Sequence, residues 1–191
     1  MEKNGTGILE QYTGSLSHRI EQEYHIGEEL YRGDIKRGLR NSDGTGVPIG
    51  VTRVGSVLGY MIEDGVRIPV PGQLYYRGIE LNEIVEAHRE GIIFGFEEVA
   101  YLLLMGYLPS RGELDRFNEI MNRARKLPNG FTEDMIMKNP SRNIMNKLAR
   151  SVLSLYSYDE NPDDTSLDNI LLQSVVLISS LPTIMVNAYQ V

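Results

Sequence analysis

One stretch, from Pro71 to Pro109, limits the folds open to this chain more than any other part of its 191 residues. Within it, the segment from Phe96 to Met105 reads FEEVAYLLLM and is apolar on nearly every helical face. A helix without a polar face must be surrounded by protein or lipid, and this one is too short to cross a bilayer. The stretch therefore predicts a buried helix that other helices enclose.

The segment before this helix has the pattern of a β-hairpin. Residues from Val51 to Tyr76 are rich in β-branched and aromatic side chains, and Glu63-Asp64-Gly65 is a hairpin turn signal. Two or three short strands cannot bury a core alone, so we expect them to lie on the helices. Arg77-Gly78 then predicts a sharp turn, and Ile79–Val85 a short amphipathic helix.

The first 40 residues predict an arm followed by a basic segment. A polar leader precedes an expected helix over Leu16–Tyr31, whose widely spaced apolar residues favour contact with another surface over burial in a core. The segment Tyr31–Arg40, YRGDIKRGLR, carries four basic residues and one aspartate in an acidic chain. It is either a solvated loop or a site for an anionic ligand.

After Pro109 the pattern is helical to the end of the chain. Ser110 and Glu113 form a capping box that starts the first of these helices. Apolar spacing predicts the helices at about 111–127, 132–138 with Thr132 as its cap, 142–156, and from 165 onward.

The last predicted helix is densely apolar, so it raises the question of a membrane span. Polar residues and Pro182 interrupt it and no basic cluster flanks it. We therefore interpret it as a buried core helix bent at Pro182, and expect no membrane partner. The pattern has no stop signal at Val191, which predicts that the natural protein continues.

Composition narrows the class of protein. A net charge of -7 argues against nucleic acid as the main partner, because neutralising phosphates needs a basic face. The chain has no cysteine, which excludes disulfides and thiolate chemistry and fits the cytoplasm. The start of the sequence lacks the apolar run of a signal peptide.

The residues by themselves predict no catalytic site and no metal site. His18, His25 and His88 lie among polar neighbours and are expected on the surface. The chain contains no HExxH or GxSxG motif. Gly50–Ser56 begins like a phosphate-binding loop but lacks its lysine.

The order of the landmarks resembles the first half of a citrate synthase. The features that carry the resemblance are Gly38-Leu39-Arg40, the hairpin, LYYRG (Leu74–Gly78), FEEVAYLLLMGYLP (Phe96–Pro109) and LISSLPTI (Leu177–Ile184). The match runs from about residue 36 to the end and covers less than half of a typical family member.

The resemblance implies a mainly α fold: part of the large helical domain, with a small β-hairpin near the N-terminus. By this resemblance, residues 1–35 are an N-terminal arm and helix. Residues 36–191 are the start of the large helical domain, truncated before the small domain. Family members are homodimers that condense acetyl-CoA with oxaloacetate, without a permanently bound cofactor. An aspartate removes a proton from the acyl methyl group while histidines stabilise the enol and polarise the ketone.

Those catalytic groups lie further along the family sequence than residue 191, so we expect this chain to be inactive alone. Arg40 matches a position where some members place an arginine near the coenzyme A phosphates, although it could be an ordinary loop arginine. Arg77 is expected to have a structural role, either pairing with a carboxylate or capping backbone carbonyls.

One difference from the family's usual sequence leaves open which subgroup of citrate synthases the chain resembles. Many members have His-Pro-Met where this chain has Asn139-Pro140-Ser141. The alternatives are a 2-methylcitrate synthase that uses propionyl-CoA, and a non-catalytic helical module for association. In either case an apolar last helix predicts self-association.

Overall fold

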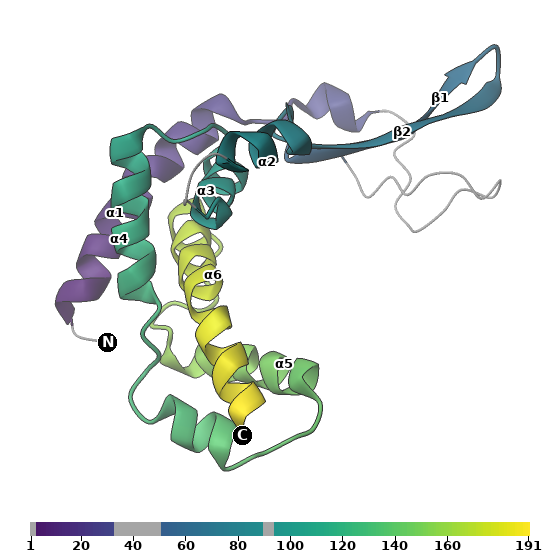
Figure 1. Ribbon diagram of the computed structural model, residues 1–191. Coiled ribbons are helices and arrows are strands. Elements are labelled where there is room, and N and C mark those ends of the chain that lie inside the picture. Colours follow the sequence, from purple (N-terminus) through teal and green to yellow (C-terminus); the bar gives the residue numbers. More distant parts are fainter. Residues whose placement is uncertain (1–2, 33–50, 90–93) are drawn as a thin grey trace. The chain divides into compact units, whose positions relative to one another are not determined.

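The computed structural model describes residues 3–32, 51–89 and 94–191 (Figure 1). It divides into two compact units: unit 1 is Met1–Arg19 with Arg111–Val191, and unit 2 is Ile20–Ser110. Helices dominate and the strands form one small antiparallel sheet, so the predicted fold class is confirmed. The predicted boundary between residues 35 and 36 lies outside the described residues and stays a prediction.

The described residues form helices and one set of strands. In chain order they are α1 (Lys3–Glu23), η1 (Glu28–Tyr31), β1 (Gly55–Glu63), β2 (Val66–Tyr76), β3 (Ile79–Glu80), α2 (Leu81–Arg89), α3 (Phe96–Met105), α4 (Arg111–Ala124), η2 (Thr132–Met137), α5 (Ile144–Leu155), η3 (Tyr156–Tyr158) and α6 (Leu167–Gln190).

The first helix corrects the sequence prediction. It starts at Lys3 instead of Leu16, so the expected polar leader is helical, and it ends at Glu23 before the short η1. Its buried face combines Leu9 and Tyr12 with two small hydroxyl residues, Thr13 and Ser17. Both hydroxyls donate to carbonyls of the same helix, Thr13 to Leu9 at 3.1 Å and Ser17 to Gly14 at 3.1 Å. Apolar periodicity does not detect a face of this kind.

The core of unit 1 lies where η2, α5 and α6 meet. Phe131, Ile136, Ile184 and Ala188 form a buried cluster, with partly buried leucines of α5 packed against it. The predicted cap Thr132 is the first residue of η2 instead, since Phe131 precedes the helix. On α5, the side chain of Asn143 accepts a hydrogen bond from the backbone N–H of Asn146 at 3.0 Å.

The last helix, α6, packs on α4, α5 and η2. It is long and apolar enough to cross a membrane by those two criteria, and 33% of its most apolar window is buried within the structure. Its buried polar residues have partners: Asn169 donates to Asn161 O and Asp164 O, both at 2.8 Å, and Ser179 donates to Val175 O at 2.6 Å. The helix therefore has one face packed in unit 1, while Ile170, Met185, Val186 and Tyr189 remain exposed, and the bend at Pro182 stays a prediction.

Unit 2 is built around α3, whose bounds match the prediction. Tyr101 and Leu102 are fully buried and Met105 nearly so. Tyr101 stacks edge-on against Tyr107, and their hydroxyls are 2.8 Å apart. Ile84 of α2 is also buried, as its helical spacing predicted.

The hairpin forms as predicted, with Glu63 paired with Val66 across the turn residues Asp64 and Gly65. Both turn residues have positive φ, 50° and 76°, as a two-residue type I′ turn requires. However, the expectation that the strands lie on helices is wrong for β1, since all nine of its residues are exposed. The hairpin is longer than a short strand pair, and its tip projects beyond α2 and α3 (Figure 1).

Candidate functional site

The residue predicted to contact coenzyme A, Arg40, lies outside the described residues. The structure therefore leaves that prediction untested.

Arg77 is held at the turn between β2 and β3. Its backbone adopts φ 50°, and Gly78 follows at φ 84°. The guanidinium reaches the C-terminal end of α3, where Nη2 and Nε both donate to Leu103 O, at 2.7 and 3.2 Å. The last four carbonyls of a helix lack partners within it, so Arg77 caps α3. Of the two predicted structural roles, carbonyl capping is confirmed.

The surroundings of Arg77 explain why it is unsuited to bind a free anion. Its guanidinium lies 5.3 Å from the centre of the Tyr24 ring, within cation–π distance. Burial lowers the pKa of Arg77 below its ordinary value, and Tyr24 opposes that shift. The same Tyr24 ring covers Gly106, which ends α3 at φ 88° and donates its N–H to Leu102 O at 2.8 Å. Two donors therefore occupy the end of the helix.

His88 differs from the other two histidines. His18 and His25 are exposed, as predicted, but the His88 side chain retains only 20% of its exposure, so the surface prediction is wrong for it. Its Nε2 lies 2.6 Å from Glu98 Oε2 on α3, and its Nδ1 lies 2.7 Å from Ile84 O on its own helix. Nε2 thus joins α2 to α3 and Nδ1 contacts α2 itself, so both nitrogens are already engaged within unit 2.

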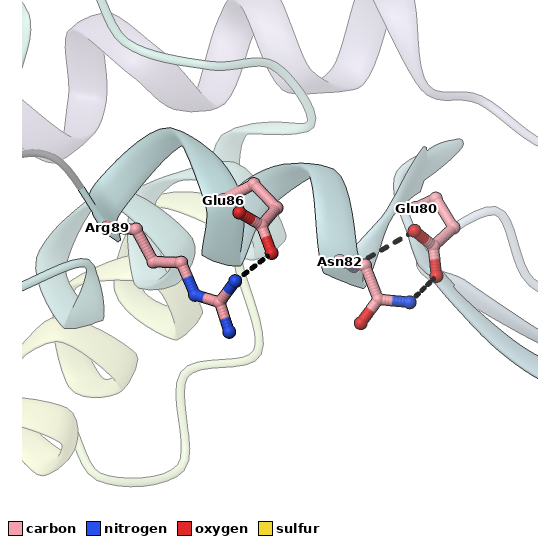
Figure 2. A network of polar contacts seen from close by, with 4 residues as sticks. All are labelled: Glu80, Asn82, Glu86 and Arg89. Atoms are coloured by element: carbon pink, nitrogen blue, oxygen red, sulfur yellow. Dashed lines mark hydrogen bonds and ion pairs between the residues drawn. The ribbon is translucent and has the colours of Figure 1, made fainter.

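The remaining polar contacts of α2 are exposed and stabilise the helix locally. Figure 2 shows two separate pairs along it. Glu80 accepts from the backbone N–H and the side-chain amide of Asn82, at 3.0 and 2.8 Å, which satisfies a donor in the first turn. Near the other end, Arg89 donates to Glu86 at 2.6 Å. These side chains do not converge on a common point, so they form no ligand site.

Unit 1 contains an open hollow of about 440 Å³ between the start of α5 and the end of α6. It is lined by Pro140, Ser141, Arg142, Ile144, Ala188, Tyr189 and Val191. Two residues of the Asn139-Pro140-Ser141 segment are thus at its wall. Ser141 also accepts from the backbone N–H of Asn143 at 3.1 Å, so its hydroxyl supports the turn into α5. The hollow has the size of a small ligand but few converging polar groups.

Beside this hollow, the buried Lys147 is a residue that the sequence prediction missed. Its side chain is 3% exposed, and its Nζ donates to Ala188 O in the last turn of α6 at 2.9 Å. A cation near a helix C-terminus is favourable because the carbonyl ends carry partial negative charge. The available signal was a lysine on the face of α5 that also carries Ile144, Leu148 and Ser151.

Chemically, these arrangements support a scaffold more than a reaction centre. Over residues 3–32, 51–89 and 94–191, no group of three histidine, cysteine, aspartate or glutamate side chains is placed to hold a metal ion. The hollow is lined by no histidine or carboxylate that could serve as a general base. The buried Lys147 and the partly buried Arg77 each donate to a helix carbonyl.

Comparison with known proteins identifies the relatives of this chain. Residues 43–191 match the family model described as citrate synthase, C-terminal domain. The citrate synthase of Corynebacterium glutamicum is 32% identical over 123 residues, which cover 62% of this chain and 26% of that protein. The 2-methylcitrate synthase of Mycobacterium tuberculosis is 26% identical over 153 residues, which cover 80% of this chain and 33% of that protein.

A solved structure shows the same fold. The crystal structure of citrate synthase from Pyrobaculum aerophilum aligns with a TM-score of 0.57 and 25% sequence identity. The alignment covers 74% of this chain and 33% of the archaeal one. The chain thus spans a third or less of the length of each of these relatives.

Proposed function

Because the chain belongs to the citrate synthase family, we propose that it is the N-terminal part of an enzyme that condenses acetyl-CoA with oxaloacetate to give citrate and CoA. The family match over residues 43–191 is the observation that carries this proposal. In it, the chain supplies scaffold helices, and acetyl-CoA is a substrate with no permanently bound cofactor. An acidic chain without cysteine supports a cytoplasmic enzyme that binds neither nucleic acid nor membrane.

The division of labour between this chain and the rest of the enzyme follows from chemistry. Forming an enolate from a thioester needs a positioned base and a donor for the developing oxyanion. The buried Lys147 and the partly buried Arg77 and His88 are each engaged in a contact to another helix. We therefore propose that the catalytic histidines and aspartate lie beyond residue 191 and that the chain alone is inactive.

A thiol assay tests this proposal. CoA release is followed with a thiol reagent, to which the chain contributes no background because it has no cysteine. The 191-residue chain with acetyl-CoA and oxaloacetate should release no CoA, whereas the complete gene product should turn over. Turnover by the chain alone at an ordinary enzyme rate of about 1–1,000 per second would refute the division of labour.

The similarity to the Mycobacterium tuberculosis protein supports a second candidate, a 2-methylcitrate synthase. Its substrate would be propionyl-CoA, one methylene larger than acetyl-CoA. A methylene in an apolar pocket changes specificity by about 10–200-fold, so comparing kcat/KM for the two thioesters separates the candidates. If the complete protein uses neither thioester, the third possibility, a non-catalytic association module, is favoured instead.

For Arg40 we propose a contact with the coenzyme A phosphates, because a guanidinium presents forked donors to phosphate. In the complete enzyme, Arg40→Ala should raise the KM for acetyl-CoA and leave the KM for oxaloacetate unchanged. Arg37→Ala, in the same basic segment, is the matched control. Equal effects of the two substitutions would indicate an ordinary loop arginine.

We also propose that the chain self-associates, as a homodimer in the complete enzyme. Met145 and Leu153 on α5 are 73% and 76% exposed, and Met185, Val186 and Tyr189 on α6 are also exposed. Exposed apolar residues gathered on helices tend to be covered by a partner. Light scattering at micromolar concentration should give a mass above 21.6 kDa; a clean monomer would contradict this.

A further inference from the structure

The β1–β2 hairpin exposes apolar side chains from both strands. Val57, Ile62 and Val66 are 79%, 69% and 63% exposed, and Met61 is 51% exposed. Beyond the two residues of β2 that pair with β3, the hairpin is only two-stranded, and such a pair is at best marginally stable in water, so a partner along β1 would stabilise it. The outer edge of β1, which pairs only with β2 among the described strands, offers free backbone donors and acceptors.

The turn and the base of the hairpin determine which backbone groups point outward. Across a two-residue turn, the closing pair Glu63–Val66 exchanges hydrogen bonds, and the pattern then alternates along the strand. Ile62 and Tyr60 therefore direct their N–H and C=O groups away from β2. At the base, Arg77 N donates to Val54 O at 2.9 Å, so alternation directs the groups of Gly55 and Val57 outward. The alternation counted from the turn and the alternation counted from the base are out of phase by one residue. The register shift between Leu58 and Tyr60 lies where the two meet.

We propose that β1 pairs antiparallel with β1 of a second copy, about a two-fold axis between Leu58 and Gly59. In this register Val57 lies opposite Tyr60 of the second copy, and Gly55 lies opposite its Ile62. It is the one register in which all four outward-facing residues meet another outward-facing residue. The two hairpins then form a continuous four-stranded sheet, which satisfies the free edge of β1.

Charge and size independently favour the same register. Arg53 at the base lies opposite Asp64 at the tip of the second hairpin, next to its Glu63, and the two-fold axis repeats this contact. At the centre, Leu58 faces Gly59, where an added Cβ would meet no atom within 4 Å. A glycine within a strand is suited to close approach by another backbone. This interface does not depend on the proposed enzyme activity.

Disulfide cross-linking tests the register directly, because the chain has no cysteine of its own. Ser56→Cys and Met61→Cys are made in two differently tagged copies and mixed under mild oxidation. These positions form a non-hydrogen-bonded pair with Cα atoms about 4.5 Å apart, within the range of a disulfide. A mixed dimer should form in high yield, whereas neither variant alone should cross-link efficiently.

The matched control is Ser56→Cys mixed with Ile62→Cys, one residue out of register and on the opposite face of the sheet. A yield from the 56–61 pair no higher than from this control would overturn the proposal. That result would indicate that another part of a longer chain, or a different protein, covers the hairpin.

A charge reversal gives a second measurement that separates this interface from association through α5 and α6. Arg53→Glu places like charges opposite one another at both ends of the paired strands, and should weaken self-association by about tenfold, more at low salt. Arg125→Glu, an equal charge change on unit 1, should have no such effect. Light scattering that shows self-association unchanged by Arg53→Glu would contradict the β1 interface while leaving helix-mediated association intact.

Discussion

The ends of α3 in unit 2 and α6 in unit 1 are stabilised by the same means in different surroundings. In both, a basic side chain from elsewhere in the unit donates to a carbonyl of the last helical turn: Arg77 to Leu103 O, and Lys147 to Ala188 O. The end of α3 also has Gly106 in the left-handed conformation, under the Tyr24 ring. The end of α6 has no such glycine, and its lysine is almost fully buried.

The two helix ends therefore differ in how far their stability depends on a single basic side chain. At α3 the carbonyls are shared between a glycine N–H and a guanidinium, so removal of either leaves the other in place. At α6 the lysine both fills space in the core with its aliphatic chain and satisfies the carbonyl. Substitutions at Gly106, Lys147 and Arg77 test this comparison, in order of decreasing expected effect, and a substitution at Asp163 tests a weaker, exposed contact.

The largest effect is expected from Gly106→Ala. A Cβ at this position would lie 2.5 Å from the Tyr24 ring, and φ 88° is unfavourable for alanine. Left-handed strain and overpacking together should lower the free energy of unfolding by about 3–5 kcal/mol, measured by urea denaturation. Gly112→Ala, on α4 where a Cβ meets no atom within 4 Å, is the control and should be neutral or slightly stabilising. A loss below 1 kcal/mol at Gly106 would mean that Tyr24 moves freely.

At the end of α6, Lys147→Ala should destabilise unit 1 by about 2–4 kcal/mol, since it removes buried aliphatic atoms and leaves Ala188 O without its donor. Lys147→Met retains the packing and isolates the hydrogen bond, with an expected loss of about 1–2 kcal/mol. If methionine were as damaging as alanine, the ammonium and not the aliphatic chain would account for the whole effect.

Arg77→Lys should have a smaller effect, a loss of about 1 kcal/mol, because an ammonium replaces two convergent N–H donors by one and loses the planar contact with Tyr24. Arg125→Lys, at an exposed arginine just after α4, is the control and should be within about 0.5 kcal/mol of the parent. Equal stability of Arg77→Lys and the parent would show that Gly106 alone suffices to end α3.

The smallest effect concerns an exposed contact on unit 1. The Tyr156 hydroxyl donates to Asp163 at 2.8 Å, and this hydrogen bond raises the pKa of Tyr156 above its ordinary value. A phenol whose pKa is raised by folding stabilises the fold below its unfolded pKa, and this contribution is lost as pH rises through the folded value. Ultraviolet titration of the phenolates should show one tyrosine moving to lower pKa in Asp163→Asn. An unchanged titration would contradict the contact.

Sequence patterns predicted elements well wherever apolar spacing or turn chemistry was explicit. The bounds of α3, the turn at Asp64 and Gly65, and the structural role of Arg77 were all recoverable from the sequence. In each case the signal is local, because an unbroken apolar run or a turn pair specifies the backbone within a few residues.

What escaped prediction depends on contacts between distant residues. The start of α1 was missed because Thr13 and Ser17 are buried by small size and by bonding their own helix. Lys147 bonds a carbonyl 41 residues later in the chain, and the sequence gives no measure of that separation in space. The exposure of β1 was missed because alternating apolar residues predict that one face of a strand is buried, but do not indicate whether the same chain or another molecule packs against that face.

The bond from Lys147 to Ala188 also sets a minimum length for unit 1. A chain shortened to end at Asn187 would keep most of α6 but would lose Ala188, whose carbonyl accepts from the buried Lys147 and whose side chain belongs to the buried cluster. Expression trials that trim this terminus should therefore lose soluble protein abruptly on passing residue 188, instead of declining gradually with each turn removed.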